Sequence, residues 1–121
     1  MYEDIQEVLF TQEQIRARVA QMGAQITADY ADRQPLVVIS VLKGAAIFMA
    51  DLVRAIDLSL EMDFMVVSSY GLGAMSSGTV SIVKDLGASI EGKHVLIAED
   101  ILDSGLTLSF LVEELSRRSP A

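Results

Sequence analysis

The fold is decided by the stretch from residue 94 to residue 107, which reads His94-Val95-Leu96-Ile97-Ala98-Glu99-Asp100-Ile101-Leu102-Asp103-Ser104-Gly105-Leu106-Thr107. It opens with an apolar run, continues with two adjacent acids and a third acid, and ends in a turn of small residues. An apolar run without polar alternation is typical of a strand covered on both faces. The order therefore predicts a buried strand that carries carboxylates to a turn at the start of a helix.

Hydrophobic periodicity places further elements around this stretch. A capping-box pattern at Thr11-Gln12-Glu13-Gln14 precedes apolar residues at helical spacing, which include Ile15. The same spacing includes Ile47 and Val112 in two later segments, and we expect these side chains to face the core. The sequence predicts helices over 12–31, 45–56 and 106–118, and strands over 36–42, 60–69, 79–84 and 94–100. This βα alternation favours an α/β fold with a doubly wound, mainly parallel sheet, in which ligands bind at the carboxyl ends of the strands.

Composition limits the chain to one domain and excludes several classes of function. With 121 residues, 51% of them hydrophobic, it can bury one core. It has no cysteine, which excludes disulfides and thiolate metal sites. A formal net charge of -8 opposes general binding to nucleic acid, because that binding needs clustered Lys and Arg.

The apolar runs are too short for a membrane span. Lys43 and Asp51 interrupt them well below the roughly 18 residues that a spanning helix needs. The acidic N-terminus, Met1-Tyr2-Glu3-Asp4, lacks the basic and apolar regions of an export signal. We therefore expect no membrane association and, by default, a cytoplasmic location.

The turn from Asp103 to Thr107 has two interpretations. Its backbone N–H groups, helped by the helix dipole, could hold a phosphate monoester. Alternatively, Asp103 or Ser104 only caps the following helix, as such residues often do. The turn alone leaves both interpretations open.

The adjacent acids Glu99 and Asp100 are similarly ambiguous. They could accept hydrogen bonds from vicinal sugar hydroxyls or bind a hydrated Mg²⁺, which prefers carboxylates together with phosphate oxygens. Taken alone, the pair is more often a solvated strand end.

Lys43-Gly44 is a second candidate for binding phosphate. It follows a predicted strand, where the glycine would let an anion approach the backbone and the lysine would supply a charge. A Walker A motif is excluded, because no glycine stands five residues before Lys43 and Ala45 replaces the hydroxyl residue. Met62 and Met65 are expected to fill the core, and His94 to be structural.

Read together, residues 95–107 resemble the phosphoribosyl pyrophosphate signature of type I phosphoribosyltransferases. The segment 41–45 resembles the pyrophosphate loop of the hypoxanthine(-guanine) branch of that family. The segment 63–71 resembles the strand and flexible loop of the same branch, and the segment 80–86 resembles a further strand of it. The resemblance runs from about residue 5 to residue 121. Its implications are a type I phosphoribosyltransferase fold and a purine salvage transferase that uses Mg²⁺.

The resemblance also implies roles for individual residues. It assigns the 5′-phosphate to the five residues of the turn, the ribose hydroxyls and the metal region to Glu99 and Asp100, and pyrophosphate to Lys43 and Gly44. Asp103 matches the acid regarded in the family as the general base near the purine N7. Ser69 and Tyr70 match the flexible loop that closes over the reacting centre. The residues named for the turn are Asp103, Ser104, Gly105, Leu106 and Thr107.

Relatives continue beyond the point that matches Ala121, with a further core strand and the residues that bind the purine. We therefore expect a single domain over residues 1–121 whose sheet is incomplete at its C-terminal side, with an open edge beside residues 95–100. Such edges invite pairing with another chain, and a homo-oligomer, dimer or tetramer, is expected.

The leading hypothesis is the transfer of ribose 5-phosphate from phosphoribosyl pyrophosphate to N9 of hypoxanthine or guanine, which yields IMP or GMP and pyrophosphate. The alternatives are a non-catalytic module that binds phosphoribosyl pyrophosphate, or an inactive fragment of the enzyme. An α/β receiver-like domain would explain the acids but not Lys43-Gly44. The sequence does not decide among hypoxanthine, guanine and xanthine.

Overall fold

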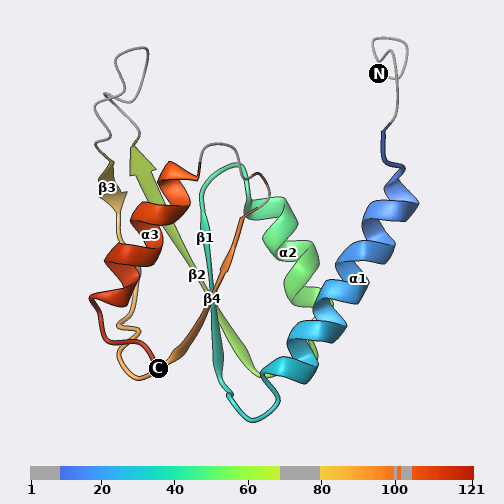
Figure 1. The fold of residues 1–121 in the computed structure, drawn as a ribbon, viewed down its shortest axis with the longest axis horizontal. Coiled ribbons are helices and arrows are strands. Elements are labelled where there is room, and N and C mark those ends of the chain that lie inside the picture. The colour runs from blue at the N-terminus through green and yellow to red at the C-terminus, as the bar shows by residue number, and fades with distance from the viewer. Residues whose placement is uncertain (1–8, 69–79, 100, 102–104) are drawn as a thin grey trace.

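A twisted sheet with helices on both of its faces forms the centre of the molecule (Figure 1). The computed structural model describes residues 9–68, 80–99, 101 and 105–121. Within these residues the sheet has four strands in the order β3-β2-β1-β4. Figure 1 shows helices α1 and α2 on one side of the strands and α3 on the other, so the expected doubly wound α/β architecture is confirmed.

Strand β1 (Leu36–Val41) lies in the middle of the sheet. It pairs in parallel with β2 (Leu60–Ser68) on one side and with β4 (His94–Ala98) on the other. Strand β3 (Ser81–Lys84) pairs antiparallel with β2. The sheet is therefore mainly parallel, as predicted, and the uninterrupted apolar run of β1 is explained because helices cover both of its faces.

The first face of the sheet packs against α1 (Gln12–Asp29) and α2 (Ala46–Arg54). Leu36 and Val38 of β1 meet Met49 and Leu52 of α2 in a cluster of buried side chains. Helices α1 and α2 touch closely at Gly23 of α1, where an added Cβ would lie 2.3 Å from the carbonyl oxygen of Ala55 at the end of α2. The contact is so close that only glycine fits there.

The second face packs against α3 (Leu106–Ser116). The intervening residues of β1, Val37 and Ile39, are buried there against Leu111 and Leu115 of the helix. Alternate residues of one strand thus feed two separate cores, as the period of two in a strand requires.

Most elements are shorter at their ends than predicted, and four side chains expected to face the core are exposed. These are Ile15, Ile47, Met62 and Val112, with exposed fractions of 55%, 77%, 44% and 49%. Figure 1 shows that α1 and α2 diverge toward their N-terminal ends, and Ile15 lines the groove between these helices. Met62 alternates with Leu60 and Phe64 on the first face but is left uncovered by the helices, whereas Met65 is fully buried as predicted.

The outer edge of β4 pairs with no other strand within the described residues. The chain leaving α3 returns to the beginning of this edge. The Gly92 N–H donates to the Ser119 carbonyl at 2.8 Å, and the Ala121 N–H donates to the Lys93 carbonyl at 2.8 Å. The expected open edge is therefore present beside β4. None of the described helices combines the length and apolarity that crossing a membrane requires.

Candidate active site

The carboxyl ends of the three parallel strands lie at one edge of the sheet. Ser40 of β1 is in register with Ala98 of β4, and Val41 is in register with Met65 of β2. The next residue after Ala98 is therefore level with the last residue of β1. The fold thus brings the chain after β1 and the chain after β4 out of the sheet side by side, as the topology of parallel strands demands.

Lys43 and Gly44 form the connection between β1 and α2. The Leu42 N–H donates to the Met65 carbonyl at 2.9 Å, and the Lys43 carbonyl accepts from the Ala46 N–H at 3.1 Å, so both ends of the connection are fixed. The Leu42–Lys43 peptide is cis, a feature with no signal in the sequence. Lys43 and Gly44 are exposed, and a Cβ added at Gly44 would meet no atom within 4 Å.

Helix α2 begins here without a side-chain cap. Its N-cap residue is Ala45, which cannot accept a hydrogen bond from the first turn. The N–H groups at the start of a helix have no partners within that helix and carry its positive dipole end. The Lys43-Gly44 connection therefore lies beside a helix terminus suited to an anion.

Helix α3 begins at the same edge of the sheet. Its N-cap is Gly105 rather than Asp103 or Ser104, with φ of 81°, a left-handed conformation that glycine adopts without strain. The Gly105 carbonyl accepts from the Ser109 N–H at 2.8 Å. Leu106 is exposed and Thr107 half-buried, and no side-chain cap is present.

Glu99 is half-buried directly after β4, between that strand and the turn that starts α3. The described residues thus bring together part of the predicted site, namely Lys43, Gly44, Glu99, Gly105, Leu106 and Thr107. The remaining predicted residues lie outside the described part of the chain: Ser69, Tyr70, Asp100, Asp103 and Ser104.

This arrangement matches a known family of proteins. The family model of the phosphoribosyl transferase domain matches residues 6–121. The chain belongs to the phosphoribosyltransferase family. It is similar to the hypoxanthine-guanine phosphoribosyltransferase of Bacillus subtilis, with 58% identity over 113 residues, 93% of this chain and 62% of that protein.

Solved structures give the same assignment. The hypoxanthine phosphoribosyltransferase of Staphylococcus aureus superposes with a TM-score of 0.91 at 50% identity, covering 99% of this chain and 65% of that one. That of Trypanosoma cruzi superposes with a TM-score of 0.87 at 45% identity, covering 95% and 64%. The chain therefore spans somewhat less than two thirds of the length of these relatives. The predicted membership of the hypoxanthine branch is confirmed.

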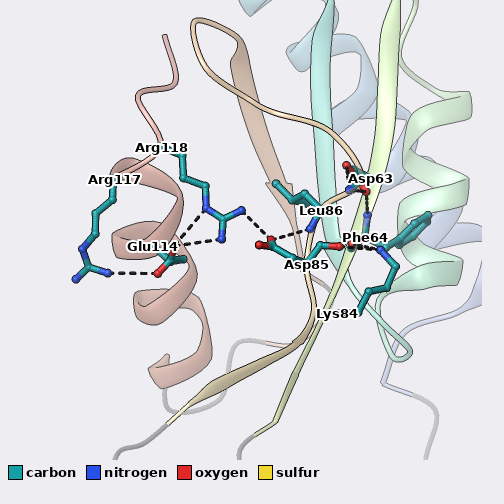
Figure 2. Close-up of polar contacts among 9 residues, drawn as sticks. Asp63, Phe64, Lys84, Asp85, Leu86, Glu114, Arg117 and Arg118 are labelled. Carbon is teal, nitrogen blue, oxygen red and sulfur yellow. Dashed lines mark hydrogen bonds and ion pairs between the residues drawn. The ribbon is translucent and has the colours of Figure 1, made fainter.

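One polar cluster was not predicted from the sequence; Figure 2 shows it, and we call it the Arg118 cluster. Arg118 donates to Asp85 at 2.7 Å and to Glu114 at 3.1 and 3.2 Å. The hydrogen bond from Arg118 holds the pKa of the Asp85 carboxyl below its usual value, and the same contact raises the pKa of Arg118. The spacing of Glu114 and Arg118 signals a pair within one helix, but the partner Asp85 follows only from the fold.

Proposed function

We propose that the chain is the phosphoribosyl-pyrophosphate-binding part of a purine salvage phosphoribosyltransferase. The reaction attaches N9 of hypoxanthine or guanine to C1 of the ribose and releases pyrophosphate, which yields IMP or GMP. One observation carries the proposal: two helices without side-chain caps, α2 and α3, begin at the same edge of the sheet, one beside Lys43 and the other beside Glu99. Two anion sites and a carboxylate suit a ligand with two phosphate groups and a sugar between them.

The family resemblance divides the ligand between these two sites. In this proposal the turn before α3 holds the 5′-phosphate, the Lys43-Gly44 connection binds pyrophosphate, and Glu99 with Asp100 addresses the ribose hydroxyls. The open space over Gly44 lets an anion reach the backbone there. Asp103 acts as the base near N7 of the purine. Ser69 and Tyr70 belong to a loop that excludes water from an oxocarbenium-like transition state.

Mg²⁺ fits the described donors as an ion shared with the ligand. The described residues contain no group of three or more His, Asp or Glu that could hold a metal by themselves. Mg²⁺ is commonly bound by one or two carboxylates together with substrate phosphates, and Glu99, with Asp100 beside it in sequence, would supply the former. The ion would neutralise charge on the departing pyrophosphate.

We further propose that residues 1–121 form one domain that corresponds to part of a longer relative. Its span of 62% of the Bacillus subtilis protein and the open edge of β4 support this. The same facts favour the second candidate, a module that binds phosphoribosyl pyrophosphate without catalysis. We also propose that the chain forms a homo-oligomer and is located in the cytoplasm.

A coupled assay for nucleotide formation, combined with the Asp103→Asn variant, tests the proposed reaction. We expect turnover of hypoxanthine with phosphoribosyl pyrophosphate and Mg²⁺, and a loss of turnover of about 10²-fold or more in the variant with binding of phosphoribosyl pyrophosphate retained. Binding without turnover in the parent chain would favour the non-catalytic module. No binding in the parent chain would refute both candidates.

A further inference from the structure

Helix α3 is attached to the sheet by apolar packing, by charged hydrogen bonds and, through the chain that follows it, by the backbone hydrogen bonds of Ser119 and Ala121 with the segment before β4. Along its length it packs through Leu111 and Leu115, which are fully and almost fully buried against the second face. At its C-terminal end it is held by the Arg118 cluster, through charged hydrogen bonds. Apolar packing is non-directional, whereas charged hydrogen bonds have defined lengths and angles.

The partner of Arg118 is itself firmly fixed to the sheet (Figure 2). The Lys84 ammonium donates to the carbonyls of Phe64 at 3.0 Å and Asp85 at 2.9 Å. Two residues further on, the Gly87 N–H donates to the Asp63 carboxylate at 3.0 Å. The segment that carries Asp85 is therefore tied to β2 on both sides of this residue.

The neighbouring Arg117 makes a useful contrast. Its side chain is 67% exposed and, among the described residues, pairs with acids of its own helix, Glu113 at 3.8 Å and Glu114 at 3.4 Å. Arg118 is 26% exposed and is the residue of the two that reaches another element, at Asp85. Exposed pairs within one helix stabilise little and cannot fix the position of the helix on the sheet.

The other end of α3 carries part of the proposed phosphate site, Gly105, Leu106 and Thr107. The helix has 11 residues, so its ends are about 16 Å apart, and a hydrogen-bonded helix moves as a rigid rod over that length. We propose that Arg118, through its contact with Asp85, is a positioning residue that sets the axial position of α3 and thereby aligns its N-terminus with the Lys43-Gly44 connection. This rests on the proposed function, since it assigns a remote residue to the same phosphate site.

The test compares Arg118→Gln with the matched control Arg117→Gln. Calorimetric titration with phosphoribosyl pyrophosphate and Mg²⁺ should show affinity about 5-fold or more weaker in Arg118→Gln and unchanged in Arg117→Gln. Asp85→Asn should weaken binding similarly, and the double variant Asp85→Asn/Arg118→Gln no further, because both changes break the same contact. Amide signals of Gly105 to Thr107 should shift in the unliganded Arg118→Gln protein and stay in place in the control.

Two readouts, the affinity for phosphoribosyl pyrophosphate and the amide signals of Gly105 to Thr107, separate positioning from general stability. Arg118→Gln and Asp85→Asn are compared under conditions where both are fully folded, so a change in affinity does not reflect unfolding. Equal affinity of Arg118→Gln and the parent chain, or additive losses in the double variant, would overturn the inference while leaving the proposed function intact. A parent chain that fails to bind would refute the proposed function. In that case the amide signals of Gly105 to Thr107 in Arg118→Gln decide the positioning role alone. Unshifted signals would overturn this role, and shifted signals would support it.

Discussion

Ser40 is fully buried in β1, and its hydroxyl has no hydrogen-bond partner among the described residues. An unsatisfied buried polar group costs about 1–3 kcal/mol of desolvation. Ser40→Ala should therefore raise the free energy of unfolding, by about 1 kcal/mol after the small loss of packing. Urea denaturation measures this, with the exposed Ser81→Ala as the control that should change little. A less stable Ser40→Ala variant would show that the hydroxyl has a partner in solution.

The ion pair of Asp85 makes stability depend on pH. Because Arg118 lowers the pKa of Asp85 in the folded state, the pair stabilises the protein above the unfolded pKa and this contribution is lost as pH falls through the folded pKa. The Asp85 side chain is 51% exposed, so solvent screening limits the contribution to about 0.2–1 kcal/mol.

Asp85→Asn should therefore be less stable than the parent chain at pH 7, and the difference should shrink in acid as the pH falls through the lowered pKa of Asp85 in the folded protein. Urea denaturation from pH 7 to pH 2.5 measures it. A difference between the two proteins that stays constant over this range would show that the carboxylate charge is not what stabilises the fold.

The positions of some single residues could be predicted from the sequence, and the exposure of others could not. The motif residues Lys43 and Glu99 could be placed at a strand edge, because their positions follow from the strands before them. The exposure of Met62 and Val112 could not be predicted. It depends on how far each helix covers the sheet, and hydrophobic periodicity does not encode this.

At the scale of elements, Gly23 decides how closely α1 can approach the chain that ends α2. An alanine there would place its Cβ 2.3 Å from the Ala55 carbonyl oxygen, so the helices must separate. Gly23→Ala should cost about 1–3 kcal/mol despite the better helix propensity of alanine. Gly44→Ala is the control, because its Cβ meets no atom within 4 Å, and should leave the free energy of unfolding nearly unchanged. A stabilised Gly23→Ala variant would contradict the close packing.

Gly105 sets the start of α3, and Gly92 provides its matched control. Both have positive φ, 81° and 72°, so alanine should cost each about 1 kcal/mol of stability. Gly105 lies before α3, at the carboxyl ends of the parallel strands, whereas Gly92 lies before β4, at their amino ends. Gly105→Ala should also weaken binding of phosphoribosyl pyrophosphate in calorimetric titration, whereas Gly92→Ala should not. Equal affinities of the two variants would separate the turn from the site.

The type and order of the seven elements in the described part of the chain were predictable, because helical spacing of apolar residues or a cap signal such as Thr11-Gln12-Glu13-Gln14 marks the helices and apolar runs mark the strands. The ends of the elements were less predictable. They depend on tertiary hydrogen bonds such as that from the Leu42 N–H to the Met65 carbonyl, which holds the chain just after β1 ends.

At the scale of the whole molecule, the site exists because parallel strands deliver separate motifs to one edge. That juxtaposition was predictable from the βα alternation, but the Arg118 cluster was not, since it joins segments 33 residues apart through side chains alone. The open edge of β4 was expected from the family resemblance and is present beside the returning chain at Ser119 to Ala121.

Removal of divalent metal should weaken ligand binding without unfolding the protein. The described residues hold no metal cage of their own, so the fold should not depend on Mg²⁺. Excess EDTA should reduce the affinity for phosphoribosyl pyrophosphate by about 10-fold or more, as expected for an ion shared between carboxylates and phosphates. The thermal unfolding midpoint of the unliganded chain should not change, and a large drop would point to a structural metal instead.

Mapping the ligand on the backbone tests most directly the central claim that the carboxyl edge of the sheet binds phosphoribosyl pyrophosphate. Amide signals of the chain would be followed by NMR during titration with phosphoribosyl pyrophosphate and Mg²⁺. We predict saturable shifts concentrated at Lys43, Gly44, Glu99 and residues 105–107. Shifts concentrated instead in the groove between α1 and α2, lined by Arg16 and Arg54, or no saturable shifts at all, would contradict the account.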